Sequence, residues 1–195
     1  LSLPASAALF VGSEQIISAL FGYGSFSSDA VYNSGKALYY FGLGLPAFAL
    51  IKVFSTFFFA NHDTKTPFYI SLFSVILNIF ISIYYFKSIG FIIIPIATTI
   101  SSWVNSIILF IFLRKRDLFN FNISTIVRLF KIIFVSILMG IFFKYLISIF
   151  EYQLVYNYYF KSFYLILSVF LGLLFYLILS LFFKAFKYED IKLKY

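Results

Sequence analysis

Six long apolar runs, separated by short polar connections, constrain what this chain can fold into more than any other feature. One connection, the hinge Ala60–Pro67, is too short to hold a soluble domain. It can only turn the chain at a membrane surface and send it back. The runs cover roughly Leu3–Phe21, Leu38–Phe59, Phe68–Phe86, Phe91–Leu113, Ile126–Phe150 and Phe163–Phe183.

Each run has the length of a membrane-spanning helix, which needs about 20 mainly apolar residues. The runs are too long for the strands of a membrane barrel and lack their alternation. Helices also satisfy their own backbone in lipid. With 63% hydrophobic and 11% charged residues, the composition agrees. The sequence therefore predicts an all-α membrane protein with six transmembrane helices.

Several classes of function are excluded by what the chain lacks. It has no Cys and one His, His62, which excludes disulfides, thiolate nucleophiles and most transition-metal sites. It contains no serine-hydrolase, Walker or dinucleotide-binding motif, so neither an enzyme nor a cofactor is predicted. The net charge of +8 indicates loop orientation and attraction to anionic phospholipids rather than nucleic-acid binding.

Lysine and arginine are unevenly divided between the two sets of connections, which predicts the orientation in the membrane. The side that carries ten of them, which includes the C-terminus, is predicted to be cytoplasmic. An even number of spans then places the N-terminal edge of this piece there too. The ten are Lys65, Arg114, Lys115, Arg116, Arg128, Lys131, Lys184, Lys187, Lys192 and Lys194, against Lys36, Lys87, Lys144 and Lys161 on the opposite side.

Two helix starts are marked by capping residues. Thr66 and Pro67 are interpreted as an N-cap followed by proline at the first helical position. Ser27, with Asp29 two residues later, is predicted to begin the next helix along the second run. His62 and Asp63 are interpreted as loop structure, because Asp accepts backbone N–H bonds in turns.

Polar residues inside the spans recur at helical spacing and predict two polar faces. The faces are expected to point into the bundle or toward an aqueous cavity, either to bond the helices together or to line a path for a ligand or ion. They comprise Ser71, Ser74, Asn78 and Ser82 in the third span, and Thr98, Ser101, Ser102 and Asn105 in the fourth.

The last two spans carry small or polar residues every fourth position, which predicts that the two helices pack along these stripes. Their other faces are apolar and are expected to face lipid or line an apolar groove. The stripes are Ser136, Gly140, Lys144 and Ser148, and Ser168, Gly172, Tyr176 and Ser180.

Lys52 lies inside a span, where a cation is expensive. It either snorkels to the membrane surface or bonds carbonyls, or it faces a central cavity that receives an anionic substrate. Glu14 in the first span is the candidate for an opposite charge, either as a partner of Lys52 or as a proton carrier.

Short motifs in order along most of the chain resemble the MurJ/MviN family, the lipid II flippases of the multidrug/oligosaccharidyl-lipid/polysaccharide exporter superfamily. Ser27 stands where the family usually has Thr, and Lys65 where it often has Arg. The last two spans match in pattern only. The matching pieces are Leu3-Pro4-Ala5, Leu20–Phe26 followed by Ser27 and Asp29, Lys52-Val53, Phe59-Ala60 with Asp63-Thr64-Lys65-Thr66-Pro67, Asn78, and Trp103-Val104-Asn105.

The resemblance implies a fourteen-helix transporter of two lobes, of which this chain forms most of the C-terminal lobe. Such a protein moves undecaprenyl-linked peptidoglycan precursor across the bacterial inner membrane by alternating access. Its N-terminal lobe, with the arginines that hold pyrophosphate, is expected outside this chain. The expected partners are lipid II, membrane phospholipids, that N-terminal lobe and the cell-wall synthesis machinery.

The resemblance also implies roles for particular residues. The substrate cavity is expected to include Lys52, Glu14, Asn78 and Asn105, and the groove for the lipid tail to include Gly140, Lys144, Gly172 and Tyr176. Asp63, Thr64, Lys65, Thr66 and Pro67 are expected to form a conformational hinge. Asn78, Ser82 and Thr98 occupy positions comparable to a cation site of some members, with serine at 82 in place of a carboxylate.

The expected organisation is four transmembrane helices over residues 1–113, a basic cytoplasmic connection over 114–125, a two-helix hairpin with the groove over 126–183, and a basic cytoplasmic tail over 184–195. Two alternatives remain open at this point. One is a flippase for another lipid-linked oligosaccharide, which the hinge disfavours. The other is a six-helix membrane scaffold with no transport role.

Overall fold

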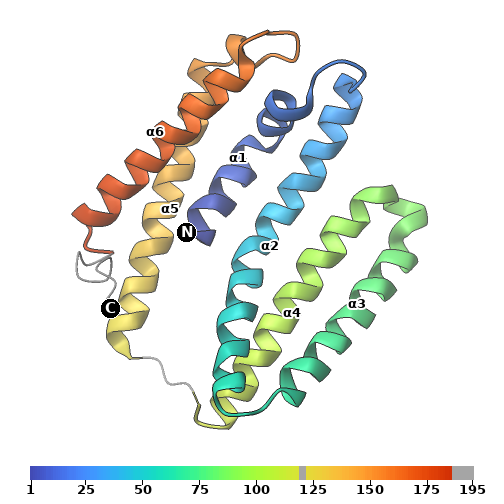
Figure 1. The fold of residues 1–195 in the computed structure, drawn as a ribbon, viewed down its shortest axis with the longest axis vertical. Helices are drawn as coiled ribbons and strands as arrows, with labels where there is room; N and C mark the ends of the chain where they lie inside the picture. The colour runs from blue at the N-terminus through green and yellow to red at the C-terminus, as the bar shows by residue number, and fades with distance from the viewer. Residues whose placement is uncertain (119–121, 186–195) are drawn as a thin grey trace. The chain divides into compact units, whose positions relative to one another are not determined.

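The computed structural model of the chain describes residues 1–118 and 122–185, and these are all α-helical apart from short connections (Figure 1). The predicted tail 184–195 therefore lies outside the described residues from 186 onward, as do residues 119–121 of the predicted basic connection. The elements are α1 (Ser2–Phe21), α2 (Ser28–Ala60), α3 (Lys65–Ile89), η1 (Gly90–Ile92), α4 (Ile93–Lys115), α5 (Ile123–Ile149), η2 (Tyr152–Leu154) and α6 (Lys161–Phe182).

The predicted all-α architecture is confirmed, and the main difference is the length of α2. This helix begins at Ser28, well before the apolar run at Leu38. Ser27 caps it as predicted, because its Oγ accepts a hydrogen bond from the backbone N–H of Ala30 at 3.2 Å. The first turns of α2 are therefore helical without being apolar, which hydropathy alone does not detect.

Within the described residues, five helical stretches are long and apolar enough to cross a membrane. The longest, Lys65–Lys115, contains both α3 and α4, and η1 with Gly90 at φ 75° reverses the chain between them. The left-handed φ at this turn favours glycine. The two helices lie side by side (Figure 1). The chain is a multi-pass membrane protein.

The chain forms two compact units. Unit 1 combines Leu3–Gly35 with Phe121–Tyr195, and thus holds α1, the first residues of α2, α5 and α6. Unit 2 is the continuous segment Lys36–Asn120, which holds the rest of α2, α3 and α4.

Each unit has its own apolar core. In unit 2, Phe58, Leu109 and Leu113 are fully buried, and Phe54 and Ile70 pack with them. Unit 1 has two clusters, listed here by their buried members: Val135, Met139, Phe143 and Tyr176, and Ala19, Leu154 and Leu165.

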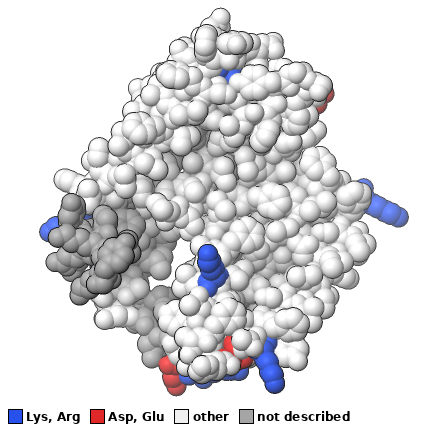
Figure 2. Space-filling model, viewed as in Figure 1, with Lys and Arg blue, Asp and Glu red and all other residues white. Residues whose placement is uncertain are grey.

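The outside of the helices is also apolar. On α3, Phe80, Ile83 and Tyr84 each expose at least 65% of their surface. The face in Figure 2 carries few charged side chains among many uncharged ones. Such a surface suits hydrocarbon rather than water.

Candidate functional site

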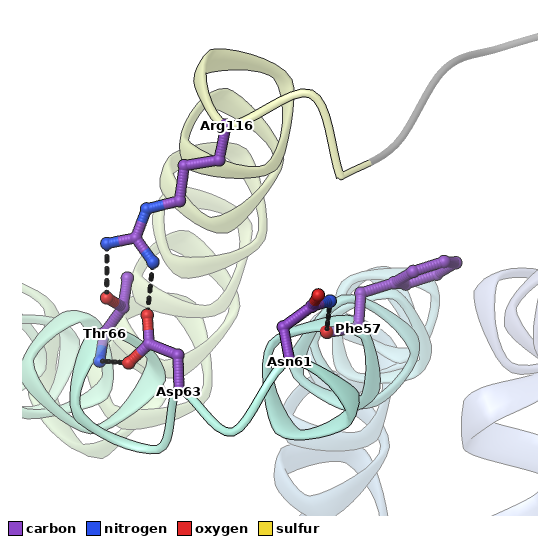
Figure 3. A network of polar contacts seen from close by, with 5 residues as sticks. All are labelled: Phe57, Asn61, Asp63, Thr66 and Arg116. Carbon is purple, nitrogen blue, oxygen red and sulfur yellow. Dashed lines mark hydrogen bonds and ion pairs between the residues drawn. The ribbon is translucent and has the colours of Figure 1, made fainter.

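The predicted hinge is a bonded turn between α2 and α3 (Figure 3). Its backbone closes onto the end of α2, since the N–H groups of Asn61 and Asp63 both donate to the carbonyl of Phe58 at 3.0 Å. His62 adopts φ 58°, so it serves the turn as loop structure, as predicted. The Asn61 side chain also donates to the carbonyl of Phe57 at 2.8 Å.

The prediction that Thr66 is the N-cap of α3 was wrong. The N-cap position is Thr64, whose side chain makes no capping hydrogen bond, and Asp63 bonds the first turn instead. The helix begins at Lys65, and Asp63 Oδ1 accepts a hydrogen bond from the backbone N–H of Thr66 at 3.0 Å. Pro67 is thus the third helical residue rather than the first. Its missing N–H still costs nothing, because the N–H groups of the first turn have no partner within the helix.

Arg116 joins the end of α4 to this turn (Figure 3). Its guanidinium forms an ion pair with Asp63 Oδ2 and donates to Thr66 Oγ1 at 3.0 Å. It also lies over the Phe58 ring, 5.7 Å from the ring centroid. Arg116 therefore links the end of α4 to α2, α3 and the turn between them.

This environment changes the titration of Asp63. Hydrogen bonds from the Thr66 side chain and backbone, followed by the Arg116 guanidinium, hold the pKa of Asp63 well below its ordinary value. The carboxylate therefore stays ionised at any physiological pH.

A second candidate lies between α3 and α4, where the two predicted polar faces meet. Asn78 Nδ2 donates to Thr98 Oγ1 at 3.0 Å, and Asn105 Nδ2 donates to Ser71 Oγ at 3.5 Å. A cavity of about 280 Å³ separates parts of the same faces. Both predicted roles, interhelical bonding and the lining of a cavity, therefore have a structural basis.

Within the described residues, this cavity is lined by neutral groups. Its polar lining consists of serine, threonine and asparagine side chains. No group of three or more His, Cys, Asp or Glu exists in the described part of the chain. The buried Ser82 Oγ and Asn105 Oδ1 have no hydrogen-bond partner. Asn78, Ser82 and Thr98 thus lack the carboxylates that hard cations favour.

The predicted packing of α5 on α6 is confirmed, but the two stripes behave differently. A Cβ at Gly172 would lie 3.4 Å from the Phe143 ring, so the α6 stripe faces α5. A Cβ at Gly140 would lie 3.3 Å from Ala7, so this part of the α5 stripe faces α1 instead. Lys144 is exposed. The α5 prediction was wrong because the α5 stripe packs against two different helices along its length.

An apolar cavity of about 280 Å³ lies where α1, α5 and α6 meet in unit 1. Of the predicted groove residues, Gly172 and Tyr176 line it, and Gly140 and Lys144 do not. Residues of α1 supply one wall, which the sequence did not indicate.

Lys52 and Glu14 are both exposed. Lys52 belongs to unit 2 and Glu14 to unit 1, so their pairing stays a prediction.

Lys161 is a buried cation that sequence reasoning missed. Only 1% of it is exposed. Its ammonium donates to the carbonyl oxygens of Gly22 and Tyr156, the latter at 2.6 Å, and lies 4.2 Å from the Tyr23 ring centroid. From the sequence, Lys161 was interpreted only as one of the charged residues of the connections. Tyr156 is close along the chain, but Gly22 and Tyr23 are far away, so no signal in the sequence indicated that this lysine is buried.

Comparison with known proteins gives consistent matches. The profile of the family described as "Lipid II flippase MurJ" matches residues 1–167. A probable lipid II flippase MurJ of Rhizobium meliloti is 38% identical over 140 residues, covering 72% of this chain and 26% of that protein. Its counterpart in Rickettsia prowazekii is 36% identical over 143 residues, covering 72% of this chain and 28% of that protein. The chain thus spans about a quarter of the length of these relatives.

A solved structure titled "Lipid II flippase MurJ, inward closed conformation" has the same fold. It aligns with a TM-score of 0.71 and 23% identity, covering 94% of this chain and 36% of that chain.

Proposed function

The chain belongs to the MurJ family of lipid II flippases, and from that membership we propose that it is part of a protein that moves undecaprenyl-linked peptidoglycan precursor across the membrane by alternating access. The observation that carries this proposal is the family match over residues 1–167 together with the shared fold. The protein is then a transporter, with lipid II as its substrate.

The chain would contribute most of the C-terminal lobe of a fourteen-helix protein, with the pyrophosphate-binding arginines in an N-terminal lobe. We place the protein in the bacterial inner membrane with the C-terminus in the cytoplasm. The uneven distribution of Lys and Arg between the connections supports this orientation.

We assign the apolar cavity of unit 1 to the lipid tail. Its walls come from α1, α5 and α6, and Gly172 leaves the room that a side chain would fill. Of the residues predicted for the lipid-tail groove, Gly172 and Tyr176 line this cavity. Gly140 contributes indirectly, because it lets α1 approach α5.

We assign substrate binding in the central cavity to Lys52, with Glu14, Asn78 and Asn105 as further candidates. Lys52 has an exposed side chain on a membrane-spanning helix, which suits an anionic headgroup. Residues 63–67 act as the hinge between α2 and α3. The contacts of Arg116 with this hinge couple its movement to that of α4. Membrane phospholipids and the cell-wall synthesis machinery are the remaining partners that we propose.

Complementation of a flippase-depleted bacterium by the full-length gene tests the function. We expect growth to be restored by the intact gene and lost when the segment that encodes this chain is deleted. Reconstituted protein should flip lipid II and not an O-antigen-type lipid-linked oligosaccharide. Faster flipping of the latter would reassign the substrate, and no flipping of either would favour a scaffold.

Lys52→Met tests the role of Lys52. We expect complementation to fail while the protein level in the membrane is unchanged. Lys115→Met, which removes an exposed lysine at the end of α4, is the matched control and should complement. Unimpaired flipping by Lys52→Met would remove this residue from the proposed site.

A further inference from the structure

Unit 1 contains a second cavity, and of its lining residues only Glu14 belongs to the proposed transport site. It has a volume of about 220 Å³ and lies beside the second half of α1, the start of α2 and the connection that follows α5. Glu14 of α1 and Glu151 after α5 both line it. Two carboxylates at one small cavity repel each other unless a cation lies between them.

Neither carboxylate has a hydrogen bond or an ion pair with the described residues of unit 1. Lys161, the buried cation of this unit, forms no ion pair with either acid. Its ammonium is held by the Gly22 and Tyr156 carbonyl oxygens. The negative charge at the cavity is therefore not compensated within the described part of this unit.

Ser18 gives a second, independent indication of a ligand. It lines the cavity and is only 5% exposed, and its Oγ has no hydrogen-bond partner among residues 1–118 and 122–185. Other buried serines behave differently: the Oγ of Ser136 and of Ser168 donates to the carbonyl four residues earlier, at 2.7 and 2.8 Å. Leaving a buried hydroxyl without a partner is costly, so a ligand that bonds Ser18 would relieve this cost.

The remaining lining distinguishes between kinds of cation. Val31, Ile147 and Leu154 add apolar side chains to the lining of the cavity. The volume exceeds what a single metal ion needs, and the described residues hold no group of three or more His, Cys, Asp or Glu. An ammonium group on a short hydrocarbon chain fits both parts of this lining. Its three N–H donors match two carboxylates and a hydroxyl, and its hydrocarbon chain matches the apolar side chains.

We propose that this cavity binds a primary alkylammonium group, with Glu14 and Glu151 as charge partners, Ser18 as a hydrogen-bond partner and Val31, Ile147 and Leu154 around the alkyl chain. This binding site is separate from the proposed substrate cavity and lipid-tail groove in all but Glu14. Two sources of the group are chemically equivalent: a soluble amine and the ethanolamine headgroup of a membrane lipid.

The test measures ligand-dependent thermal stabilisation of the full-length protein in detergent. We expect n-butylammonium to raise the transition temperature in a saturable way, and tetramethylammonium or sodium at equal concentration to have little effect. Glu151→Gln should weaken the apparent affinity about tenfold, as expected for the loss of one charge-assisted hydrogen bond. Ser18→Ala should weaken it less. Asp117→Asn, which removes one exposed charge from unit 2, should leave it unchanged.

The same variants in nanodiscs identify the source. If the lipid headgroup is the ligand, phosphatidylethanolamine should stabilise the wild-type protein more than phosphatidylcholine does, and Glu151→Gln should abolish the difference. If the soluble amine is the ligand, n-butylammonium should act equally in both lipids. Equal stabilisation of the wild type and Glu151→Gln by both probes would overturn the proposal, as would equal effects of sodium and n-butylammonium. If Glu151→Gln does not fold, Ser18→Ala takes its place. Equal stabilisation of the wild type and Ser18→Ala by both probes would then overturn the proposal.

Discussion

At the residue scale, the Asp63 side chain stabilises the turn between α2 and α3 through two contacts. The same carboxylate caps α3 through the Thr66 N–H and pairs with Arg116 from the end of α4. Charge-assisted hydrogen bonds of this kind are stronger than neutral ones. The turn between α2 and α3 therefore depends on a residue that the sequence indicated only as part of a loop.

Substitutions at Asp63 and Arg116 should separate these two contributions. Asp63→Asn keeps a capping oxygen and loses the ion pair, so we expect a smaller fall in the transition temperature than for Asp63→Ala. Arg116→Gln should resemble Asp63→Asn, and the double variant Asp63→Asn/Arg116→Gln should be no worse than either single change. Thermal unfolding of the full-length protein checks this. Fully additive losses would show that the two residues act separately.

The low pKa of Asp63 predicts an acid-dependent loss of stability. Because folding lowers this pKa, the ionised carboxylate stabilises the folded state at neutral pH, and the contribution is lost as the pH falls below the ordinary Asp value of about 3.9. Transition temperatures measured from pH 7 to pH 3 should fall less steeply for Asp63→Asn than for the wild type. Parallel curves would contradict the assignment.

Lys161 gives a prediction for the other unit. Lys161→Met preserves the length of the side chain but leaves the Gly22 and Tyr156 carbonyls without their donor, so we expect a loss of about 2 kcal/mol in the free energy of unfolding. Lys131→Met, at a half-buried position of α5, is a control with the same change of residue type. Equivalent stability of the two variants would show that the buried ammonium contributes nothing.

At the scale of elements, the helices were predictable and their partners were not. Hydropathy and length locate a span because lipid demands an apolar helix, and all six runs became helices. The polar faces of α3 and α4, which were expected to point into the bundle or toward a cavity, meet each other, since these helices are neighbours in sequence joined by a tight turn. The predicted packing of the α5 stripe on α6 was wrong at Gly140, because Gly140 packs on Ala7 of α1, which is far away along the chain.

A close approach of the α2 backbone to the α1 backbone in unit 1 is testable at Gly35. A Cβ at Gly35 of α2 would lie 2.9 Å from the Cα of Glu14, and backbone cannot move aside as a side chain end can. We expect Gly35→Ala to destabilise the protein by about 1–3 kcal/mol, the usual cost of overpacking. Gly172→Ala is the control, because its Cβ would make ordinary contact at 3.4 Å with Phe143. Unfolding measurements that rank Gly172→Ala as the worse variant would contradict this packing.

At the scale of the whole molecule, the orientation in the membrane follows from the charges of the connections. The chain contains no cysteine, so single cysteines introduced into a cysteine-free full-length protein report on one site each. Lys115→Cys should be shielded from a membrane-impermeant thiol reagent in intact cells, and Tyr159→Cys, at a position 83% exposed, should react. The reverse pattern would invert the proposed topology.

The order along the chain of the segments that form the two units has a consequence for biosynthesis. Unit 2 is one continuous segment, whereas unit 1 is built from the first and the last parts of the chain. The ribosome therefore completes unit 2 before it makes α5 and α6, which belong with α1 in unit 1. The Gly22 carbonyl gains the Lys161 ammonium only when α6 emerges. Until then, α1 lacks the contacts that α5 and α6 provide, and a stop in translation before α6 leaves it without them. Nascent chains truncated before α6 should accordingly be the ones that membrane quality-control proteases remove.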